Sequence, residues 1–598
     1  MCGFVAVINS NENSDNLVLS FNKLRKLNYH RGPDEVKVLH KNKYSLLFRR
    51  LEIIDLNNRS AQPFSSDDNK INLVFNGEIY NYLEIKKELK KLNVKFKTKS
   101  DTEVILKSYI HWGPDFIKKL RGMFSIIILD NNKKKYFCFR DRLGQKPLFY
   151  SKYKGGIIIS SEIKDIIFFK NKKKIKENQN TVLKYLLRGW CDDDEKTFFS
   201  GINSFPSGSI GVIDGSSIKI KKYWHLEIKT NKTFDKEEFE EVFSDNIKIH
   251  LRADVPIAFT LSGGFDSSSI VKKSLEFKQQ NNKAYSFISN NKNENDEKKF
   301  IKQFLRENSL NHSFVSSNKK FEKDLLEELI YFQDEPISTI SFLNQFSLRK
   351  KIHKDGFKVL LVGEGGDEVL GGYNRMFLPY LYSVYIKNKK EVPDRVKKNI
   401  SLNLGKDFKL INKSLTNYST HLDKYSDIED KTPLKFLNIS EKEIPENLRF
   451  YNNTSVSKTN SFKSFLLNHI FKRDLPHILR QEDRISMSQS IENRTPFVDH
   501  KFLEYIFSIE EKFFMQEGKS KFMLRSIMKN KLPQSYFRKK KVGRPGDPSI
   551  LIFDIYYDLF LDLLNHNYSL NSYFDDKKLK QNLILDKKNK NYNNKNFY

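Results

Sequence analysis

The sequence predicts a mixed α/β fold made of two different parts. In the N-terminal third, short apolar segments alternate with turns, which is typical of stacked β-sheets. From about Phe234 the pattern changes to long helical stretches around an apolar strand that runs into a Ser-Gly-Gly turn. At 598 residues the chain is also too long for a single hydrophobic core. We therefore expect a domain boundary between about Tyr223 and Lys236.

Five apolar segments of the N-terminal part are predicted strands: Phe4–Ile8, Tyr44–Phe48, Asn72–Phe75, Phe124–Leu129 and Gly156–Ser160. Two segments with helical spacing, at about 81–92 and 102–112, are predicted helices between these strands. The last segment, 576–598, is rich in Lys and Asn and has few apolar residues. For that reason we expect it to be a frayed, flexible tail.

Composition excludes several classes of protein. The three cysteines, Cys2, Cys138 and Cys191, lie far apart, which argues against a disulfide scaffold or a zinc site and indicates a reducing compartment. No charged-then-apolar leader opens the sequence, and its apolar runs are too short to span a membrane. The net charge of +31 is mostly Lys spread along the whole chain, without a nucleic-acid-binding signature. These features predict a cytoplasmic protein that binds neither nucleic acid nor a membrane.

Cys2 is the first candidate catalytic residue. Removal of Met1, which a small second residue permits, would leave a thiol and a free α-amine on one residue. The amine, with a pKa near ~8, can act as base for its own thiol, which is how N-terminal nucleophile enzymes are activated. A cysteine near an N-terminus has no special role more often than it has one. The interpretation therefore depends on the other motifs.

A second motif, Ser262-Gly-Gly-Phe-Asp-Ser267, follows an apolar strand and precedes a helical stretch. This arrangement presents backbone N–H groups and hydroxyls at a helix N-terminus, which suits a phosphate or pyrophosphate. The glycines allow close approach, and Asp266 can hold a Mg²⁺ that offsets the phosphate charge. The motif is not the GxxxxGK[ST] loop, so adenylation with release of pyrophosphate is favoured over γ-phosphate transfer. The alternative is an ordinary turn capped by serine.

The third motif is another apolar strand that ends in glycines and carboxylates, Val359-Leu-Leu-Val-Gly-Glu-Gly-Gly-Asp-Glu368. Because ligands of α/β sheets bind at the carboxyl ends of strands, we expect this loop to lie beside the first. Asp367 can then share the Mg²⁺ with Asp266, and Glu364 can orient or deprotonate an attacking nucleophile. A solvated acidic turn is the alternative.

Together these residues resemble the glutamine-dependent asparagine synthetase family, in which an N-terminal nucleophile glutaminase is joined to an ATP-pyrophosphatase-type synthetase. The resemblance runs from Cys2 to about Pro545. Further matching motifs, in the same order, are Arg31-Gly-Pro-Asp34, Arg50-Leu-Glu-Ile-Ile-Asp55, Asn76-Gly-Glu-Ile-Tyr-Asn81, Ser100-Asp-Thr-Glu103, Asp141-Arg-Leu-Gly-Gln-Lys-Pro147, Asp483-Arg-Ile-Ser-Met487 and Glu492-Asn-Arg-Thr-Pro-Phe-Val-Asp499. The resemblance implies a four-layer αββα glutaminase domain over 1–222, a parallel-sheet α/β synthetase domain over 230–575 and the tail over 576–598.

The resemblance also implies the chemistry of the first domain. Cys2 would attack the side-chain amide of glutamine to give a thioester and ammonia, and Asn76 with the Gly77 amide would form the oxyanion hole. Arg50 would bind the glutamine α-carboxylate, while Glu78 and Asp101 would bind its α-ammonium group. For the Asn-Gly pair, a hairpin turn is the alternative.

In the second domain, the resemblance implies that a carboxylate attacks ATP, that pyrophosphate leaves, and that ammonia then displaces AMP. The expected ATP-binding residues are Leu261, Ser262, Gly263, Gly264, Asp266, Ser267, Ser289, Val362 and Gly363, and the expected Mg²⁺ ligands are Asp266 and Asp367. Glu364 is the expected base, and Lys541 is the lysine expected to balance phosphate charge. Val362 and Arg544 depart from the family pattern, which has serine and phenylalanine there.

Aspartate is the expected acceptor, so that the small-molecule substrates are glutamine, ATP and aspartate and the product is asparagine. The alternative is an enzyme of the same family that amidates another carboxylate, such as a uronic acid sugar of a surface polysaccharide, a peptide or a secondary metabolite. A binding protein that had kept only the fold would be expected to lack Cys2 or one of the two glycine-rich loops, and both loops and Cys2 are present. Homodimers are frequent in the family, so the resemblance also allows a homodimer.

Overall fold

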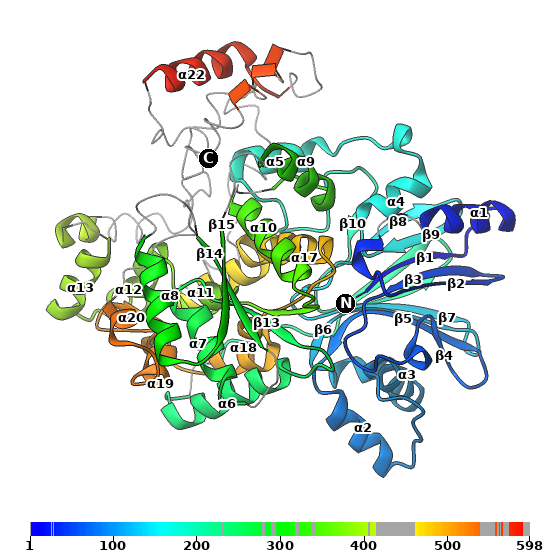
Figure 1. Cartoon of the computed structure of the whole chain (residues 1–598), viewed down its shortest axis with the longest axis horizontal. Coiled ribbons are helices and arrows are strands. Elements are labelled where there is room, and N and C mark those ends of the chain that lie inside the picture. Colours follow the sequence, from blue (N-terminus) through cyan, green and yellow to red (C-terminus); the bar gives the residue numbers. More distant parts are fainter. Residues whose placement is uncertain are drawn as a thin grey trace.

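The computed structural model describes residues 2–25, 27, 29–229, 232–277, 282–288, 295–316, 322–337, 339, 341–404, 407–413, 461–538, 557–558, 561–562, 564–565 and 573–589. Two parts of different construction lie side by side (Figure 1). The N-terminal part is built on antiparallel sheets and the C-terminal part on a parallel sheet, which confirms the predicted fold class.

Two six-stranded antiparallel sheets form the N-terminal part. The first has the order β10 (Asn203–Ser204), β8 (Phe149–Tyr153), β9 (Gly156–Ser160), β1 (Gly3–Ile8), β3 (Tyr44–Arg50), β2 (Glu35–Lys41). The second has the order β12 (Ser217–Lys222), β11 (Ser209–Asp214), β7 (Lys135–Arg140), β6 (Gly122–Asp130), β5 (Ile71–Ile79), β4 (Phe64–Ser65). The five strands predicted from apolar segments are confirmed as β1, β3, β5, β6 and β9.

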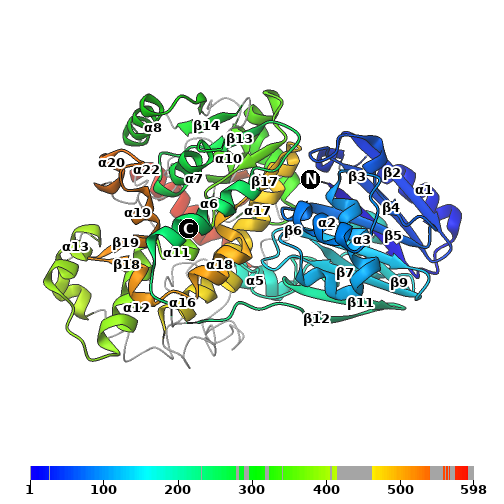
Figure 2. The same ribbon diagram turned by 90° about the horizontal axis from the view of Figure 1, so that it is seen from below.

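The two sheets pack face to face, and helices cover their outer faces. Phe4 of β1 lies in the apolar cluster between the sheets, whereas its neighbour Val5 lies in the cluster beneath α1 (Ser14–Leu24) and α4 (Ile163–Lys170). On the opposite side, α2 (Tyr82–Lys91) and α3 (Asp101–Trp112) cover the second sheet, as Figure 2 shows. A further helix of this part is α5 (Gln179–Arg188). The four layers are those that the family resemblance implies.

A five-stranded parallel sheet forms the centre of the C-terminal part, in the order β15 (Asn311–Ser316), β14 (Lys283–Ile288), β13 (Ile257–Thr260), β16 (Val359–Leu361), β17 (Glu492–Arg494). The helices α7 (Phe265–Ser274) and α8 (Asn295–Glu307) contribute to the apolar cluster on one face, and α10 (Ser341–Lys354) covers the other. Both faces are buried, which explains why β16 and the first three residues of β13 are apolar.

Further helices of this part are α6 (Lys236–His250), α9 (Glu322–Gln333), α11 (Gly366–Leu370), α12 (Phe377–Leu381), α13 (Asp394–Leu404), α16 (Phe462–Asn468), α17 (Leu475–Ser488), α18 (His500–Ile506), α19 (Phe522–Met528) and α20 (Gln534–Arg538). A short hairpin of β18 (Met515–Gln516) and β19 (Lys519–Ser520) precedes α19. Among the described helices, we find none with the length and apolar character that a membrane span requires.

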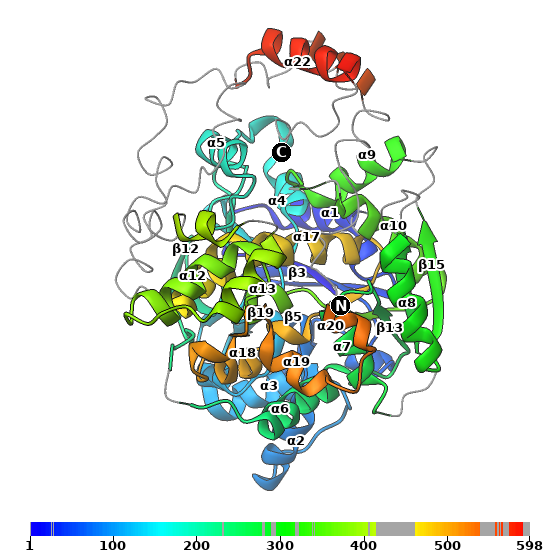
Figure 3. The same ribbon diagram turned by 90° about the vertical axis from the view of Figure 1, so that its left-hand side faces the viewer.

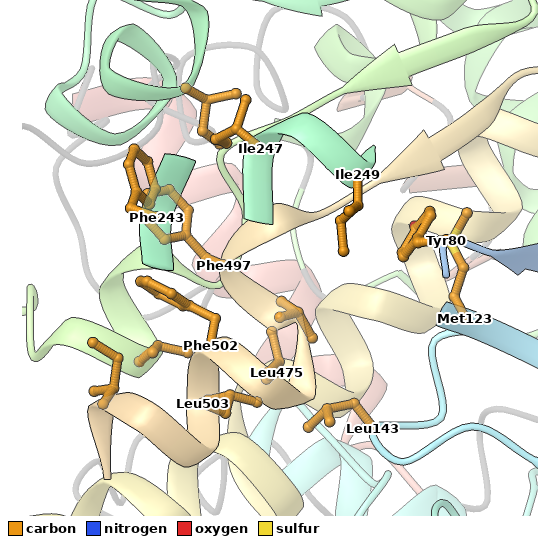
Figure 4. Close-up of a cluster of buried hydrophobic side chains, with 14 of the residues drawn as sticks. Tyr80, Met123, Leu143, Phe243, Ile247, Ile249, Leu475, Phe497, Phe502 and Leu503 are labelled. Carbon is orange, nitrogen blue, oxygen red and sulfur yellow. The ribbon is translucent and has the colours of Figure 1, made fainter. Parts of the chain in front are cut away.

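One apolar cluster continues across the junction of the two parts. Tyr80, Met123 and Leu143 of the N-terminal part belong to the same cluster as Leu475 and Phe497 of the C-terminal part, and Figure 4 shows these side chains together. Helix α17 runs along this junction and contacts the short helical turn that contains Arg31. A buried apolar contact of this kind holds the two parts in a defined relation.

Helix α22 (Asp576–Asn589), at the top of Figure 3, lies within the segment that is expected to be a flexible tail. Its N-terminus is capped, because the Lys578 N–H donates to Asp575 Oδ1 at 3.1 Å. Leu579 and Leu583 are four residues apart and share a face, on which Leu583 is buried. The Lys and Asn content of the whole segment hides this short amphipathic pattern.

Two candidate active sites

Cys2 lies immediately before β1 and is buried, with 8% of its surface exposed. Its backbone N–H donates to Asn76 Oδ1 at 3.2 Å, and its Sγ lies 4.0 Å from the Leu51 carbonyl oxygen. The other half of the Asn76 amide, Nδ2, is buried and has no hydrogen-bond partner among the described residues. A hydrogen-bond donor beside the Cys2 thiol is therefore available to a substrate oxygen. Burial raises the pKa of the Cys2 thiol.

Strand β5 places the side chains of Asn76 and Glu78 on the same face of the sheet. Residues two apart in a strand point to one face, so both side chains lie on the inner face of the second sheet. Gly77, between them, has φ +148°, and a Cβ atom there would lie 2.0 Å from the Met123 carbonyl oxygen. Glycine is therefore required where β5 approaches β6.

Glu78 and Asp101 are buried carboxylates at the same end of this part. Asp101 is the first residue of α3, which Ser100 caps, and Asp101 Oδ2 accepts a hydrogen bond from the Ile79 N–H at 3.1 Å. Burial raises the pKa of Asp101 to about 6, and burial together with Asp101 raises the pKa of Glu78. Two buried acids with raised pKa values favour the binding of a cation.

Arg50, the residue expected to bind an α-carboxylate, ends β3 and is buried. Its Nη1 donates to Glu52 Oε1 at 2.9 Å, and its Nη2 donates to the Asp55 carbonyl oxygen at 2.6 Å. These contacts to its own neighbours fix the guanidinium. The ends of β1, β3, β5 and α3 thus supply the six residues predicted for glutamine hydrolysis.

The second candidate site is a cavity of about 290 Å³ at the carboxyl ends of β13 and β16. The two strands are parallel neighbours, with Ile257 opposite Val359, so the loops that follow them leave the sheet at the same edge. The polar residues that line the cavity include Ser262, Asp266, Ser267, Glu364, Asp367 and Lys521. The two glycine-rich motifs predicted to lie together therefore do so.

The loop after β13 is held in shape by its own serines. Ser262 Oγ lies 2.9 Å from Ser267 Oγ and accepts a hydrogen bond from the Gly264 N–H at 3.2 Å. The second loop approaches closely, because a Cβ atom at Gly366 would lie 2.8 Å from Asp266 Cγ. Side-chain hydroxyls and the start of α7 are thus presented to the cavity, as an anion site requires.

Lys521, which was not predicted as a site residue, lies between the two loops. Its Nζ forms an ion pair with Asp266 Oδ2 and lies 2.6 Å from Asp367 Oδ1. The side chain is 7% exposed; burial alone would lower its pKa, but the two carboxylates raise it, so the ammonium group stays charged. The residue follows the β18–β19 hairpin, far from both loops in sequence. No local pattern around Lys521 links it to them.

Asp266 and Asp367, the predicted Mg²⁺ ligands, face this one ammonium group. Within the ranges that the structure describes, no group of three or more His, Cys, Asp or Glu residues is arranged to hold a metal ion. Mg²⁺ is usually held by one or two carboxylates together with substrate phosphates. The pair therefore fits a Mg²⁺ ion that is bound together with phosphate oxygens.

Glu368 and Tyr373 also line this cavity and were not predicted as site residues. The Tyr373 hydroxyl donates to Glu368 Oε1. Burial, followed by the neighbouring Asp367, raises the pKa of Glu368 to about 7. A buried carboxyl of this kind can take up or release a proton near neutral pH.

The other predicted ATP-binding residues have different positions. Gly263 precedes Gly264 in the loop, and Gly363 lines the cavity. Leu261 and Val362 are buried behind the lining, where the Leu261 N–H donates to the Tyr285 carbonyl oxygen at 2.8 Å. Ser289 and Lys541 lie outside the described residues.

Comparison with known proteins agrees with this arrangement. Residues 1–224 match the model of the glutamine amidotransferase domain, and residues 238–597 match the model of asparagine synthase. The chain is 29% identical over 569 residues to asparagine synthetase [glutamine-hydrolyzing] 1 of Bacillus subtilis, a match that covers 91% of this chain and 87% of that protein.

Two other relatives differ in name. A putative asparagine synthetase of Methanocaldococcus jannaschii is 33% identical over 397 residues, which is 62% of this chain and 76% of that protein. Amidase chyE of Penicillium rubens is 26% identical over 577 residues, covering 84% of this chain and 80% of that protein. Since the asparagine synthase match spans more than half of the chain and follows a glutamine amidotransferase match, the chain belongs to the asparagine synthase family of glutamine-dependent amidotransferases.

Proposed function

We propose that this protein is a glutamine-dependent asparagine synthetase, with a glutaminase domain over 1–222 and an ATP-dependent synthetase domain over 230–575. One observation carries the proposal: the Ser262–Ser267 loop and the Gly363–Glu368 loop meet at one cavity, in a chain whose other part holds Cys2 beside Asn76. The first site would release ammonia from glutamine. The second site would activate the carboxylate that this ammonia attacks.

In the glutaminase site, the Cys2 thiolate attacks the side-chain carbonyl carbon of glutamine. The α-amine of Cys2, released by removal of Met1, accepts the thiol proton and returns it to the leaving nitrogen. Asn76 Nδ2, buried without a partner in the described structure, and the Gly77 N–H stabilise the oxyanion. The C–N bond breaks, ammonia leaves, and water hydrolyses the thioester to glutamate.

Arg50 binds the α-carboxylate of glutamine, and Glu78 with Asp101 binds its α-ammonium group. The raised pKa values of these two acids support this assignment, because a bound cation would relieve the repulsion between buried carboxylates. The same contacts would distinguish glutamine from simple amides.

In the synthetase site, a carboxylate oxygen of the acceptor attacks the α-phosphorus of ATP, and pyrophosphate leaves. Ser262, Ser267 and the start of α7 bind the phosphates. Lys521 offsets the charge that develops on the pyrophosphate. Mg²⁺ held by Asp266 and Asp367 would supply further positive charge when bound.

Ammonia then attacks the acyl carbon of the adenylate. Glu364 accepts a proton from the attacking nitrogen, the bond from carbon to the phosphate oxygen breaks, and AMP leaves with the amide as the second product. Glu364 lines the cavity beside Asp367, which supports this role.

Aspartate is the proposed acceptor. A second candidate, amidation of a different carboxylate such as a uronic acid sugar, is favoured by one finding: relatives named as amidases match the chain with 26–27% identity, close to that of the named asparagine synthetases. Both candidates use the two sites in the same way. They differ only in the molecule that enters the cavity beside Glu364.

Pyrophosphate release by the purified protein with ATP, Mg²⁺ and glutamine, measured with and without aspartate, tests the proposal. Aspartate-dependent pyrophosphate with an equal amount of asparagine is the expected result. Glutamate formation without aspartate-dependent pyrophosphate would contradict aspartate as acceptor and favour the second candidate. Absence of glutamate formation would contradict the glutaminase assignment itself.

A further inference from the structure

A buried arginine of the C-terminal part reaches the candidate glutamine site of the N-terminal part. Arg494 ends β17, and its Nη2 lies 3.3 Å from Glu78 Oε2. Its side chain has no exposed surface, and that of Glu78 is 3% exposed. This ion pair therefore crosses the junction of the two parts inside the protein.

The Arg494 guanidinium is fixed by several neighbours. Its Nε donates to Glu492 Oε1 at 2.6 Å, and its Nη1 donates to the carbonyl oxygens of His250 and Arg252, both at 2.7 Å. The guanidinium also lies over the Tyr80 ring, 5.5 Å from its centre. With three directions already occupied, Nη2 is held at one place, beside Glu78.

Glu78 uses only one of its oxygens in this pair. Its other oxygen, Oε1, is buried and has no hydrogen-bond partner in the part of the chain that the structure describes. Arg494 thus holds Oε2 and leaves Oε1 for a second cation. Asp101, buried nearby, would share that cation.

The charge of Arg494 influences the pKa of Glu78. Burial and Asp101 both raise the pKa of Glu78, and Arg494 is the largest influence that lowers it. Without the guanidinium, the pKa of Glu78 would rise further, which would weaken an ion pair between this carboxyl and an ammonium group.

We propose that Arg494 is a positioning residue for glutamine recognition: it pairs with Glu78 Oε2 and orients the carboxyl so that Glu78 Oε1 receives the α-ammonium group of glutamine. This inference rests on the proposed function, because it takes Glu78 as part of the glutamine site. It adds that the synthetase part of the chain completes that site. The specificity for an α-amino group would then depend on a residue outside the glutaminase domain.

The main chain of Arg494 has a separate contact that makes the test selective. Its carbonyl oxygen accepts a hydrogen bond from the Val362 N–H at 3.0 Å, next to the Gly363–Glu368 loop of the synthetase site. A side-chain substitution keeps this carbonyl. Ammonia-dependent amide synthesis therefore reports whether the variant is folded and whether its synthetase site is intact.

The experiment compares glutamine with glutaramate, which is glutamine without its α-amino group, in the wild-type chain and in Arg494→Gln and Arg494→Lys variants. Glutaramate is followed as a substrate or, where its turnover is slow, as a competitive inhibitor of glutamine hydrolysis. We expect Arg494→Gln to raise the KM for glutamine about ten- to a hundredfold, as for loss of a charge-assisted contact, with little change in kcat or in glutaramate binding. Arg494→Lys, which keeps the charge, should lie between wild type and Arg494→Gln.

Arg484→Gln is the matched control. Arg484 is equally buried and also lies near the junction, within 4.0 Å of Glu162, but its ion pairs are with Glu162 and Asp334. It should change glutamine and glutaramate binding by the same factor.

Equal effects of the Arg494 substitutions on glutamine and glutaramate, or no effect on either, would overturn the inference. If Arg494→Gln loses ammonia-dependent synthesis because it does not fold, Arg494→Lys is used instead. The test is then whether Arg494→Lys weakens the binding of glutamine more than that of glutaramate. A wild-type protein that does not hydrolyse glutamine would instead contradict the proposed function, and this inference with it.

Discussion

Asp483 Oδ2 accepts hydrogen bonds from both terminal nitrogens of Arg31, each at 3.0 Å. Asp483 lies on α17 in the C-terminal part, and Arg31 lies beside the candidate nucleophile, where its Nε donates to the Cys2 carbonyl oxygen at 3.3 Å. Lys146 Nζ donates to the other oxygen of Asp483 at 3.1 Å. The carboxylate thus connects the two parts beside the main chain of Cys2.

Replacing this carboxylate should disturb the glutaminase site more than the synthetase site. Burial would raise the pKa of Asp483, but Arg31 and then Lys146 lower it, so the group is charged in the folded protein. Asp483→Asn would remove the carboxylate that Lys146 and Arg31 share, although Arg31 keeps its contact with Glu162 at 3.3 Å. Loss of a shared buried partner costs about 3–5 kcal/mol in the free energy of unfolding. We expect glutamine-dependent turnover to fall at least about tenfold, while ammonia-dependent turnover changes less. Steady-state assays with the two nitrogen donors measure this.

Asp192→Asn provides the control for that experiment. Arg480 of the same helix donates to Asp192 Oδ1 at 2.6 Å, so this substitution also breaks a contact between the two parts. No described contact of Asp192 involves Cys2 or Arg31, and the two nitrogen donors should be affected alike. If Asp483→Asn also lowered both activities equally, Asp483 would have only a structural role.

Glutamine binding should weaken in acid because of Asp101. Burial raises the pKa of this carboxyl to about 6 in the folded protein, from the ordinary value of 3.8, so it gains a proton as the pH falls through about 6. The protonated form cannot pair with the α-ammonium group of glutamine. The KM for glutamine should therefore rise by up to about tenfold per pH unit below pH 6.

The stability of the folded protein depends on the ionisation of Asp101 in the opposite sense. A carboxyl with a raised pKa binds a proton more tightly in the folded chain than in the unfolded chain, so its contribution to stability is lost as the pH rises through 6.

Asp101→Asn should remove the inflection in KM near pH 6 and leave a high KM at all pH values. An inflection that persisted in this variant would assign it to another group, such as Glu78.

Lys521 should be needed for ATP chemistry and not for glutamine hydrolysis. Its ammonium group lies between Asp266 and Asp367, so Lys521→Met would leave two partly buried carboxylates facing each other. We expect pyrophosphate release to fall by at least about a hundredfold, as for loss of an electrostatic contact to the transition state. Glutamate formation from glutamine should be retained.

The same variant should respond more strongly to Mg²⁺ than the wild type. Without the ammonium group of Lys521, the carboxylates of Asp266 and Asp367 repel each other. A bound cation should therefore raise the stability of this variant more than that of the wild type. Thermal unfolding with and without Mg²⁺ measures this, and Lys519→Met, at the exposed start of β19, is the control. An equal effect of Mg²⁺ on the Lys521→Met variant and the wild type would contradict the assignment of Asp266 and Asp367 as its ligands.

The sequence predicted those features whose signal is local. Short apolar runs separated by turns identified β1, β3, β5, β6 and β9, and the glycine-rich turns identified the two loops that meet at the cavity. In each case the physical cause acts over a few residues.

Contacts between distant segments were not predictable from the sequence. Lys521 reaches the nucleotide loops from the β18–β19 hairpin, and Arg494 and Asp483 reach the glutaminase site across the junction. Tertiary packing brings these charges together, and a lysine or arginine in isolation has no local pattern that reveals its partner. Helix α22 was missed because four-residue spacing of a few apolar side chains is weak within a Lys- and Asn-rich segment.

The central claim is that one chain releases ammonia at Cys2 and uses it at a separate ATP-dependent site. Formation of AMP and amide product by Cys2→Ala, with glutamine or with ammonium as the nitrogen donor, tests it most directly. We predict that glutamine-dependent product disappears while ammonium-dependent product remains at the wild-type level. Glutamine-dependent product that persisted in Cys2→Ala would contradict the claim.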